Sequence, residues 1–270
     1  MSANHKIKLV VLDLDGTAVD FGCHAPAIAM LEAFSRQRIM LTMQQVRSSL
    51  GLPNYEHVRT LLEMPAVSEQ FQIVHGRRWN EADVMDLDHE LVELQTEAVT
   101  RHCDLVPELA ACVEELRRRG IKIGTTTSYP RPAAEQIWDA LAMAGVEIDA
   151  HVAPDDVPSG RPAPWMIFRL MQELDVFPPA CVVKVGDTAA DIEEGKNAGC
   201  WTAVVIHSGN EIGLTLQDWK SLPLAEQEER QHNVVRKLRE TCASDWLPTL
   251  ANLPPAIDDF EGHLAVGETP

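Results

Sequence analysis

Two aspartates one residue apart, Asp13 and Asp15, are residues whose types and spacing could do chemistry. They end the apolar run 7–12, which predicts a buried strand. Alternate residues of an extended chain point to the same side, so both carboxylates can face one pocket. Gly16 follows them and allows the backbone to turn sharply. The pair is a candidate site, although a turn with two solvated carboxylates would also fit these residues alone.

A second acidic pair, Asp187 and Asp191, follows the apolar-biased run 182–185. One helical turn separates the two carboxylates, because they lie four residues apart. Hard oxygen ligands of this kind suit Mg²⁺, which keeps several waters and binds few protein carboxylates. The structural alternative is a helix N-cap followed by an acid in the first turn, which is a common arrangement.

Hydroxyl and basic side chains between the two pairs suit a phosphate group. Thr127 stands at the end of the predicted strand 121–126, and Ser128 and a new helix follow it. A hydroxyl and backbone N–H groups at a helix start can bind a phosphate oxygen. Arg161 is always charged and can bind two oxygens at once. Alone, residues 125–128 are better explained as a strand end and helix cap, and the structural alternative for Arg161 is a surface arginine in a proline-rich loop.

Four short segments, in order along the chain, resemble the four motifs of the haloacid dehalogenase (HAD) superfamily. They are Asp-Leu-Asp-Gly-Thr at 13–17, Thr-Thr-Thr-Ser at 125–128, Gly-Arg-Pro at 160–162 and Gly-Asp-Thr-Ala-Ala-Asp at 186–191. The resemblance implies that Asp13 attacks phosphorus, that Asp15 handles a proton and that Arg161 neutralises the phosphoryl group. The implied catalytic residues are Asp13, Asp15, Thr127 and Arg161, and the implied Mg²⁺ ligands are Asp13, Asp15, Asp187 and Asp191.

Longer segments are similar to phosphonoacetaldehyde hydrolase (phosphonatase), a family within this superfamily. The most specific is Asp-Asp-Val-Pro-Ser-Gly-Arg-Pro at 155–162, and the similarity covers most of the chain. The resemblance also implies a homodimer formed through a cap domain. The substrate-binding and cap residues that it implies are Cys23, Asn54, His57, Ser128 and Tyr129. Cys23 matches a pocket position, whereas His57 fits a plain helix face as well as a pocket.

The chain departs from phosphonatases at two positions. In those enzymes a cap lysine condenses with the substrate aldehyde to give an iminium electron sink, but the matching residue here is Asn54. No lysine lies between Lys8 and Lys122 to replace it. Phosphonatases also carry a small apolar residue at the place of Asp15, where HAD phosphatases have an aspartate that protonates the leaving oxygen. The resemblance therefore predicts a phosphatase that cleaves a P–O bond through an aspartyl-phosphate.

Three alternatives stay open at this point. The first is phosphonoacetaldehyde hydrolysis by a route without the cap lysine, and the second is a phosphomutase, since mutases of the superfamily keep both aspartates. The third is a non-catalytic protein on the same scaffold, which the complete acid, base and metal set argues against.

Composition and charge limit the partners. The net charge of −18 argues against nucleic acid and anionic membranes, whose phosphates would repel the chain. It does not exclude a small phosphorylated or phosphonate metabolite, since Mg²⁺ and Arg161 can make the electrostatic potential at the site positive. No apolar run reaches the length of a bilayer span, and the start leads directly into the first strand. We therefore expect a cytoplasmic protein.

The order of the expected elements predicts an α/β fold. Residues 1–19 and 104–257 alternate strand and helix patterns, which favours a Rossmann-like, doubly wound parallel sheet of the HAD type with a site at the strand carboxyl ends. Residues 20–103 are expected to be all helical and to form an inserted cap that closes over the site and excludes water. Residues 258–270 are expected to be an acidic tail that frays.

Overall fold

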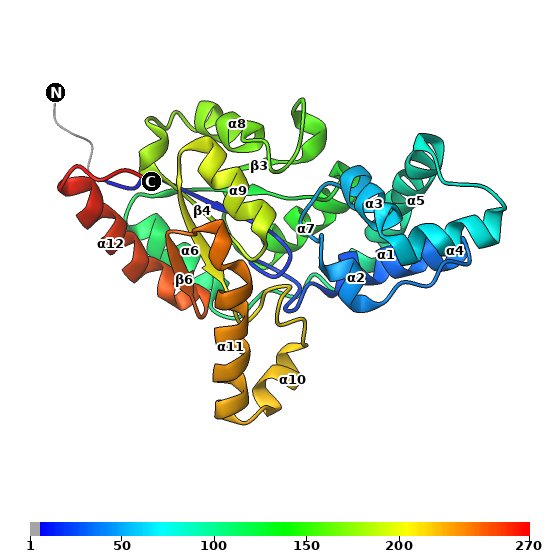
Figure 1. Ribbon diagram of the computed structural model, residues 1–270. Helices are drawn as coiled ribbons and strands as arrows, with labels where there is room; N and C mark the ends of the chain where they lie inside the picture. Colours follow the sequence, from blue (N-terminus) through cyan, green and yellow to red (C-terminus); the bar gives the residue numbers. More distant parts are fainter. Residues whose placement is uncertain (1–5) are drawn as a thin grey trace.

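The computed structural model describes residues 6–270, and its centre is a single parallel sheet (Figure 1). The strand order β3-β2-β1-β4-β5-β6 places β1 between β2 and β4. In register, Leu12 pairs with both Thr125 and Val185, so these three strands end at the same level. The strands are β1 (Leu9–Leu12), β2 (Lys122–Thr126), β3 (Ala150–Val152), β4 (Val182–Gly186), β5 (Trp201–Val205) and β6 (Asp245–Leu247).

Helices cover both faces of the sheet, because alternate residues of its fully buried strands are apolar on both sides. Leu9 and Val11 of β1 pack on one face, and Val10 and Leu12 pack on the other. The first face is covered by α8 (Trp165–Glu173) and α9 (Ala189–Ala198), and the second by α6 (Leu109–Arg118), α7 (Arg131–Met143) and α12 (Leu253–Ala265). The predicted doubly wound α/β fold is confirmed.

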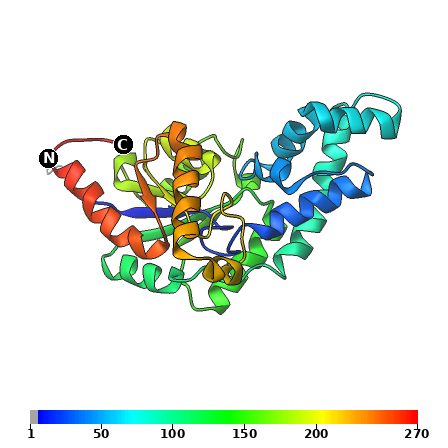
Figure 2. The same cartoon turned by 60° about the horizontal axis from the view of Figure 1, so that its bottom comes forward.

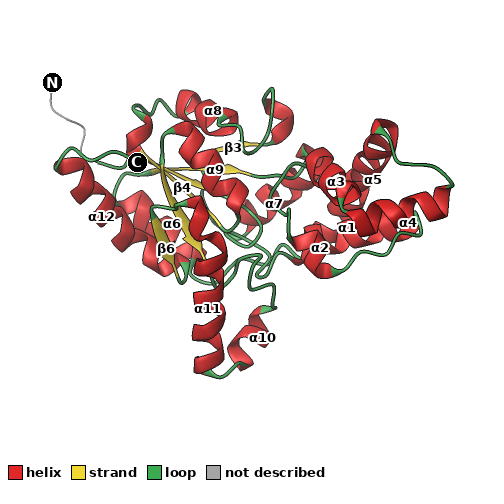
Figure 3. Cartoon of the chain, in the orientation of Figure 1, coloured by secondary structure: helices red, strands yellow, loops and turns green. Residues whose placement is uncertain are grey.

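The segment between β1 and β2 contains helices and no strand within the part of the chain that is described (Figure 3). The last of its helices, α6, packs on the sheet, and the five before it are α1 (His24–Arg36), α2 (Met43–Arg47), α3 (Asn54–Glu63), α4 (Pro65–His75) and α5 (Glu81–Val99). We call residues 24–99 the cap. Figure 2 shows it at one end of the molecule, beside the sheet. The chain enters and leaves the cap side by side, since Asp20 N donates to Asp104 O at 3.0 Å and Val106 N to Ala18 O at 2.9 Å.

The remaining helices lie after β5. They are α10 (Leu216–Ser221) and α11 (Leu224–Leu238), which project from the sheet in Figure 1. Short 3-10 turns lie at Pro154–Asp156, Pro179–Cys181, Arg239–Thr241 and Leu250–Asn252. None of the helices between residues 6 and 270 combines the length and the apolar character that a bilayer crossing needs.

The expected fraying of residues 258–270 is wrong over its first part, because α12 continues to Ala265. Ile257, Phe260 and Leu264 repeat at helical spacing and are buried, and Phe260 stacks on Trp201 with ring centroids 5.1 Å apart. The acidic residues of this segment lie on the outer face, where Asp258 pairs with Arg119 at 2.7 Å. Helix α4 and strand β6 were likewise not expected from the sequence.

Candidate active site

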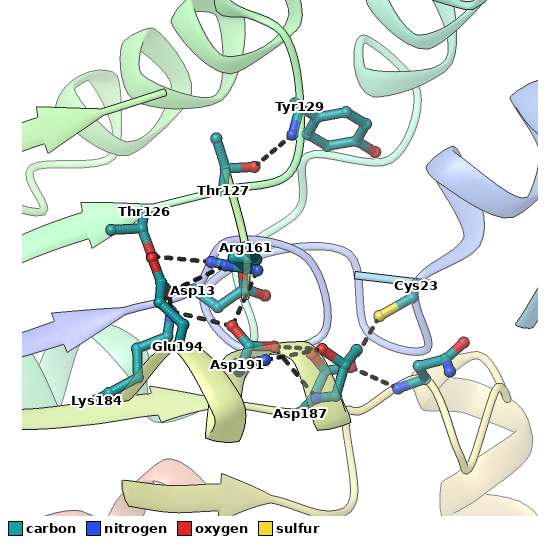
Figure 4. Close-up of polar contacts among 12 residues, drawn as sticks. Asp13, Cys23, Thr126, Thr127, Tyr129, Arg161, Lys184, Asp187, Asp191 and Glu194 are labelled. Carbon is teal, nitrogen blue, oxygen red and sulfur yellow. Dashed lines mark hydrogen bonds and ion pairs between the residues drawn. The ribbon is translucent and has the colours of Figure 1, made fainter. Parts of the chain in front are cut away.

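Three parallel strands deliver the candidate residues to one edge of the sheet. Asp13 follows β1, Thr127 follows β2 and Asp187 follows β4, and the Asp13 N–H extends the ladder by donating to Val185 O at 2.9 Å. Carboxylate oxygens of Asp13, Asp187 and Asp191 lie within 4.8 Å of one another (Figure 4). The first and fourth sequence motifs, although far apart in the chain, therefore form one cluster.

Local geometry at the start of α9 places Asp191 in this cluster. Thr188 is the N-cap, and its hydroxyl and backbone N–H donate to Asp191 Oδ2 at 2.6 and 3.2 Å. A Cβ on Gly186 would lie 2.2 Å from Asp191 Cγ, so the side chain needs a glycine at this position. The N-cap interpretation and the metal-ligand interpretation of Asp191 are thus compatible, because its second oxygen, Oδ1, faces the cluster.

Two buried cations neutralise part of the cluster. Arg161 reaches Asp13 at 2.7 Å, Asp191 at 2.9 Å and Glu194 at 3.1 Å. Lys184 reaches Asp191 at 3.0 Å and Glu194 at 3.2 Å. Arg161 therefore contacts the proposed nucleophile directly, as the resemblance implies.

The hydroxyl of Thr126 accepts a hydrogen bond from Arg161 and another from Lys184, both at 2.8 Å. Sequence reasoning did not single out Thr126, Lys184 or Glu194. The available signal was Lys184, a charged residue inside the apolar run 182–185, because such a residue in a buried strand needs a carboxylate partner.

Burial and neighbouring charges shift the pKa values of the carboxyl groups in this cluster in different directions. Burial, reinforced by the charge of Asp191, raises the pKa of Asp13 to about 6 even though Arg161 and Lys184 oppose the change. Burial and the charges of Asp13 and Asp191 raise the pKa of Asp187 well above its usual range. Burial acts against ionisation of Asp191 too, but Arg161 and Lys184 outweigh it and lower the pKa of Asp191 to about 2.

The residues present fit a divalent cation. Buried Asp187 Oδ1 accepts no hydrogen bond from residues 6–270 and belongs to a group of oxygen ligands of the kind that Mg²⁺ prefers. The cluster of Asp13, Asp187, Asp191 and Glu194 has only Arg161 and Lys184 as buried basic neighbours among residues 6–270, so negative charge is in excess when all are ionised. A bound cation would remove that excess and would favour the ionised forms of Asp13 and Asp187.

Asp15 is also buried, with 8 % of its surface exposed. Burial and then the charges of Asp20, Asp13 and Asp187 raise its pKa well above the ordinary value, while Tyr129 has an opposing, smaller influence. Tyr129 is fully buried, and its N–H donates to Thr127 Oγ1 at 3.1 Å. Ser128 between them is half-buried. The turn after β2 thus carries Thr127 and Tyr129 on the side of the acidic cluster that is opposite Asp187 (Figure 4).

Cys23 joins the cluster from the segment that leads into the cap. Its thiol donates to Asp187 Oδ2 at 3.1 Å, and burial together with the charge of Asp187 raises its pKa well above the usual value (Figure 4). The group therefore stays a neutral thiol and is not a reactive thiolate. A Cβ on Gly16 would lie 2.4 Å from Cys23 Sγ and 2.5 Å from Asp187 Oδ2, so this approach requires a glycine there.

Asn54 and His57 make their hydrogen bonds inside the cap. The Asn54 and Gln95 amides form a reciprocal pair at 2.7 and 2.8 Å, which joins α3 to α5. His57 Nε2 lies 2.9 Å from Val46 O and is buried between α3 and the C-terminal part of α2. Of the two interpretations of His57 that the sequence allowed, these contacts favour a structural role within the cap.

The environment of His57 predicts a specific pH dependence of stability. Burial lowers its pKa from 6.5 to about 4. A histidine with a lowered pKa in the folded state contributes stability above pH 6.5, and this contribution is lost as pH falls towards 4, because only the unfolded chain binds the proton there. Between pH 7 and pH 5 we expect the wild-type free energy of unfolding to fall about 2 kcal/mol more than that of His57→Gln. Urea denaturation at both pH values measures the difference, and equal pH slopes would contradict it.

The cap closes directly over the acidic cluster. A Cβ on Gly51 would lie 2.4 Å from Thr188 Oγ1, and a Cβ on Gly160 would lie 2.8 Å from Pro53 Cγ, so the start of the cap helix α3 is seated between the third and fourth motifs. Asp13, Asp187 and Arg161 are at most 5 % exposed in this arrangement. Entry of a substrate therefore requires the cap to move away from the sheet.

Comparison with known proteins agrees with this geometry. The family described as haloacid dehalogenase-like hydrolase matches residues 7–199. Phosphonoacetaldehyde hydrolase of Bacteroides fragilis is 38 % identical over 259 residues, covering 96 % of this chain and 98 % of the relative. The corresponding enzyme of Syntrophobacter fumaroxidans is 39 % identical over 264 residues, covering 98 % and 95 %.

A solved structure of a phosphonoacetaldehyde hydrolase-like protein from Oleispira antarctica has a TM-score of 0.96. It is 32 % identical, with 98 % of this chain and 96 % of that chain covered. The relatives match the chain over nearly its full length, including both the sheet and the cap. The chain therefore belongs to the haloacid dehalogenase-like hydrolases, in the family of phosphonoacetaldehyde hydrolase and its relatives.

Proposed function

We propose that this enzyme is a Mg²⁺-dependent phosphatase that cleaves the P–O bond of a small phosphate ester through an aspartyl-phosphate. One observation carries the proposal: Asp15, an acid, lies buried beside the nucleophile candidate Asp13. P–O cleavage expels an alkoxide that needs a proton, and a carboxylic acid at this place can supply it. The cap position that would need an amine for P–C cleavage is Asn54, whose amide is already paired with Gln95.

In the first half-reaction, the hydroxyl of Thr127, the guanidinium of Arg161 and nearby backbone N–H groups would hold the phosphoryl oxygens. A carboxylate oxygen of Asp13 attacks phosphorus, the ester P–O bond breaks, and Asp15 gives its proton to the leaving oxygen. Asp13, Asp187, Asp191 and the backbone carbonyl of Asp15 would hold Mg²⁺, which would neutralise charge on the transferring group and leave the Asp15 carboxyl free for proton transfer.

In the second half-reaction, Asp15 takes a proton from water as the water oxygen attacks phosphorus. The bond from phosphorus to Asp13 breaks, which releases phosphate and returns Asp13 to its carboxylate form. The closed cap shields the first step from bulk water, since the reacting carboxyl groups are almost inaccessible when it is seated.

A mixed panel of substrates tests the proposal together with Asp15. We expect Mg²⁺-dependent phosphate release from small phosphate esters and little or none from phosphonoacetaldehyde. Replacing Asp15 with Ala is expected to lower ester hydrolysis roughly 10²- to 10⁴-fold, because the leaving oxygen and the attacking water lose their proton donor and acceptor. Asp88→Ala removes a half-buried carboxyl of the cap helix α5, outside the proposed chemistry, and is the control.

Phosphonoacetaldehyde hydrolysis is the second candidate, favoured by the name of the relatives at 38 % and 39 % identity. It requires an amine from a source other than residue 54. Reduction with borohydride in the presence of phosphonoacetaldehyde would then attach the substrate covalently to a lysine. A trapped lysine adduct together with efficient P–C cleavage would replace the phosphatase proposal, whereas ester hydrolysis without an adduct supports it. The homodimer formed through the cap stays a prediction for this enzyme.

A further inference from the structure

The loop after β5 contacts both the acidic cluster and the cap. Asn210 in this loop is 2 % exposed, and its backbone N–H donates to Asp187 Oδ2 at 2.7 Å. The neighbouring Ser208 holds the turn after β1 through a hydrogen bond from its hydroxyl to Gly16 O at 2.6 Å. The same loop thus binds Asp187 through Asn210 and binds the turn that follows Asp13 and Asp15 through Ser208.

The side chain of Asn210 is bound on its other side by Arg47 of α2. Arg47 Nη1 donates to Asn210 Oδ1 at 2.9 Å and to Asn210 O at 3.1 Å, and Asn210 Nδ2 donates back to Arg47 O at 3.0 Å. We call this set of hydrogen bonds the cap bridge. A Cβ on Gly213 would lie 3.0 Å from Arg47 Cζ, so the guanidinium is packed against the loop as well as bonded to it.

These contacts join the cap to the acidic cluster through one residue. Arg47 belongs to the cap, which must move for a substrate to enter, and Asp187 belongs to the acidic cluster. A cavity of about 440 Å³ borders Arg47, Thr188 and Asn210, so this junction between cap and sheet lies at the edge of an open space. Opening the cap would remove the hydrogen bonds that hold the Asn210 side chain and would leave its loop less constrained.

We propose that Asn210 is a positioning residue that couples cap closure to the orientation of Asp187, with Arg47 as the group that reports closure. This inference rests on the proposed function, because it assigns Asp187 to the Mg²⁺ site of that reaction. The consequence is that the acidic cluster has its full affinity for Mg²⁺ and its full activity only when the cap is seated.

Three variants separate the parts of the cap bridge. Asn210→Ala removes the side-chain bonds and leaves the backbone N–H that serves Asp187. Arg47→Met removes the same bonds from the cap side, and Arg47→Lys keeps a charged donor. Arg59→Met is the matched control, since Arg59 is a cap arginine that pairs with Glu63 and Glu81 inside the cap.

The decisive measurements are Mg²⁺ affinity by isothermal titration calorimetry and the separate values of kcat and KM for p-nitrophenyl phosphate. We expect Asn210→Ala and Arg47→Met each to weaken Mg²⁺ binding and to lower kcat roughly 10-fold or more, as loss of a residue that orients a metal ligand does. The double variant is expected to stay within roughly threefold of either single variant, because both remove one interaction. Arg47→Lys should recover part of the loss, and Arg59→Met should match the wild type.

Wild-type Mg²⁺ affinity and kcat in both single variants, with only a lower melting temperature, would overturn the inference and leave a structural contact. Independent, multiplying effects in the double variant would also overturn it. If the wild type releases no phosphate from any ester, the proposed function fails, and the calorimetric comparison still decides whether the cap bridge controls the cation site.

Discussion

Asp13→Asn is expected to abolish phosphate release, by roughly 10⁴-fold or more, without unfolding the protein. Asparagine has the same shape but its amide oxygen does not form the covalent phosphoryl intermediate. The fold should tolerate the change because Asn can still accept the hydrogen bond that Arg161 donates at 2.7 Å. The substitution also removes a negative charge from a buried cluster in which burial and Asp191 already raise the pKa of Asp13.

The measurement combines steady-state phosphate release with intact-protein mass spectrometry after acid quenching. Asp15→Asn keeps the nucleophile but lacks the base for hydrolysis, so it should accumulate the mass of one phosphoryl group when an activated ester is supplied. Asp13→Asn should show no such adduct. Normal turnover by folded Asp13→Asn, or an adduct on a different residue, would show that the nucleophile is not Asp13.

Arg161→Met is expected to lower the free energy of unfolding by about 3–5 kcal/mol, a large loss for a single substitution. Arg161 is 2 % exposed and contacts Asp13, Asp191 and Glu194. Its removal leaves three buried carboxylates with Lys184 as their remaining basic partner among residues 6–270. Uncompensated buried charge is far more unfavourable than loss of an exposed pair, which changes stability by about 0–1 kcal/mol.

Urea denaturation at neutral pH measures the effect, and Arg101→Met is the matched control because Arg101 is 70 % exposed where it pairs with Glu97. The loss should shrink as pH falls, since carboxyl groups without Arg161 have higher pKa values in the folded state and can be protonated. Arg161→Lys should retain more stability than Arg161→Met, but lysine offers one nitrogen in place of the three through which Arg161 contacts the three carboxylates. Equal stability of Arg161→Met and the wild type would mean that the desolvation of Arg161 already offsets its ion pairs.

Much of the candidate site could be predicted because its residues depend on local rules. Alternation along an extended chain predicts that Asp13 and Asp15 share a side, and a spacing of one helical turn predicts that Asp187 and Asp191 lie together, as they do in the cluster. Each of the two pairs follows an apolar strand, and parallel strands carry their carboxyl ends to a common edge. These regularities also predict the doubly wound sheet and the helical insertion between β1 and β2.

Other parts of the molecule could not be predicted because they depend on which distant segments meet. Glu194 became the shared partner of Arg161 and Lys184 only when β4, α9 and the segment with the third motif packed together. The acidic composition after residue 257 suggested fraying, but Phe260 stacks on Trp201, which lies far away in the sequence, and this contact stabilises α12. The composition of a segment gives only its average polarity, whereas the burial of each side chain depends on the surface against which the segment packs.

By itself, then, the amino-acid sequence determined the chemical groups of this enzyme, their order and the sheet edge at which they gather, because strand and helix periodicity are local properties. Only the tertiary structure decided which charges neutralise the acidic cluster, that Asn54 and His57 are bonded within the cap, and that Arg47 meets Asn210. Those outcomes depend on side chains separated by up to 163 residues, and no periodic pattern encodes which of many polar groups will face one another after packing.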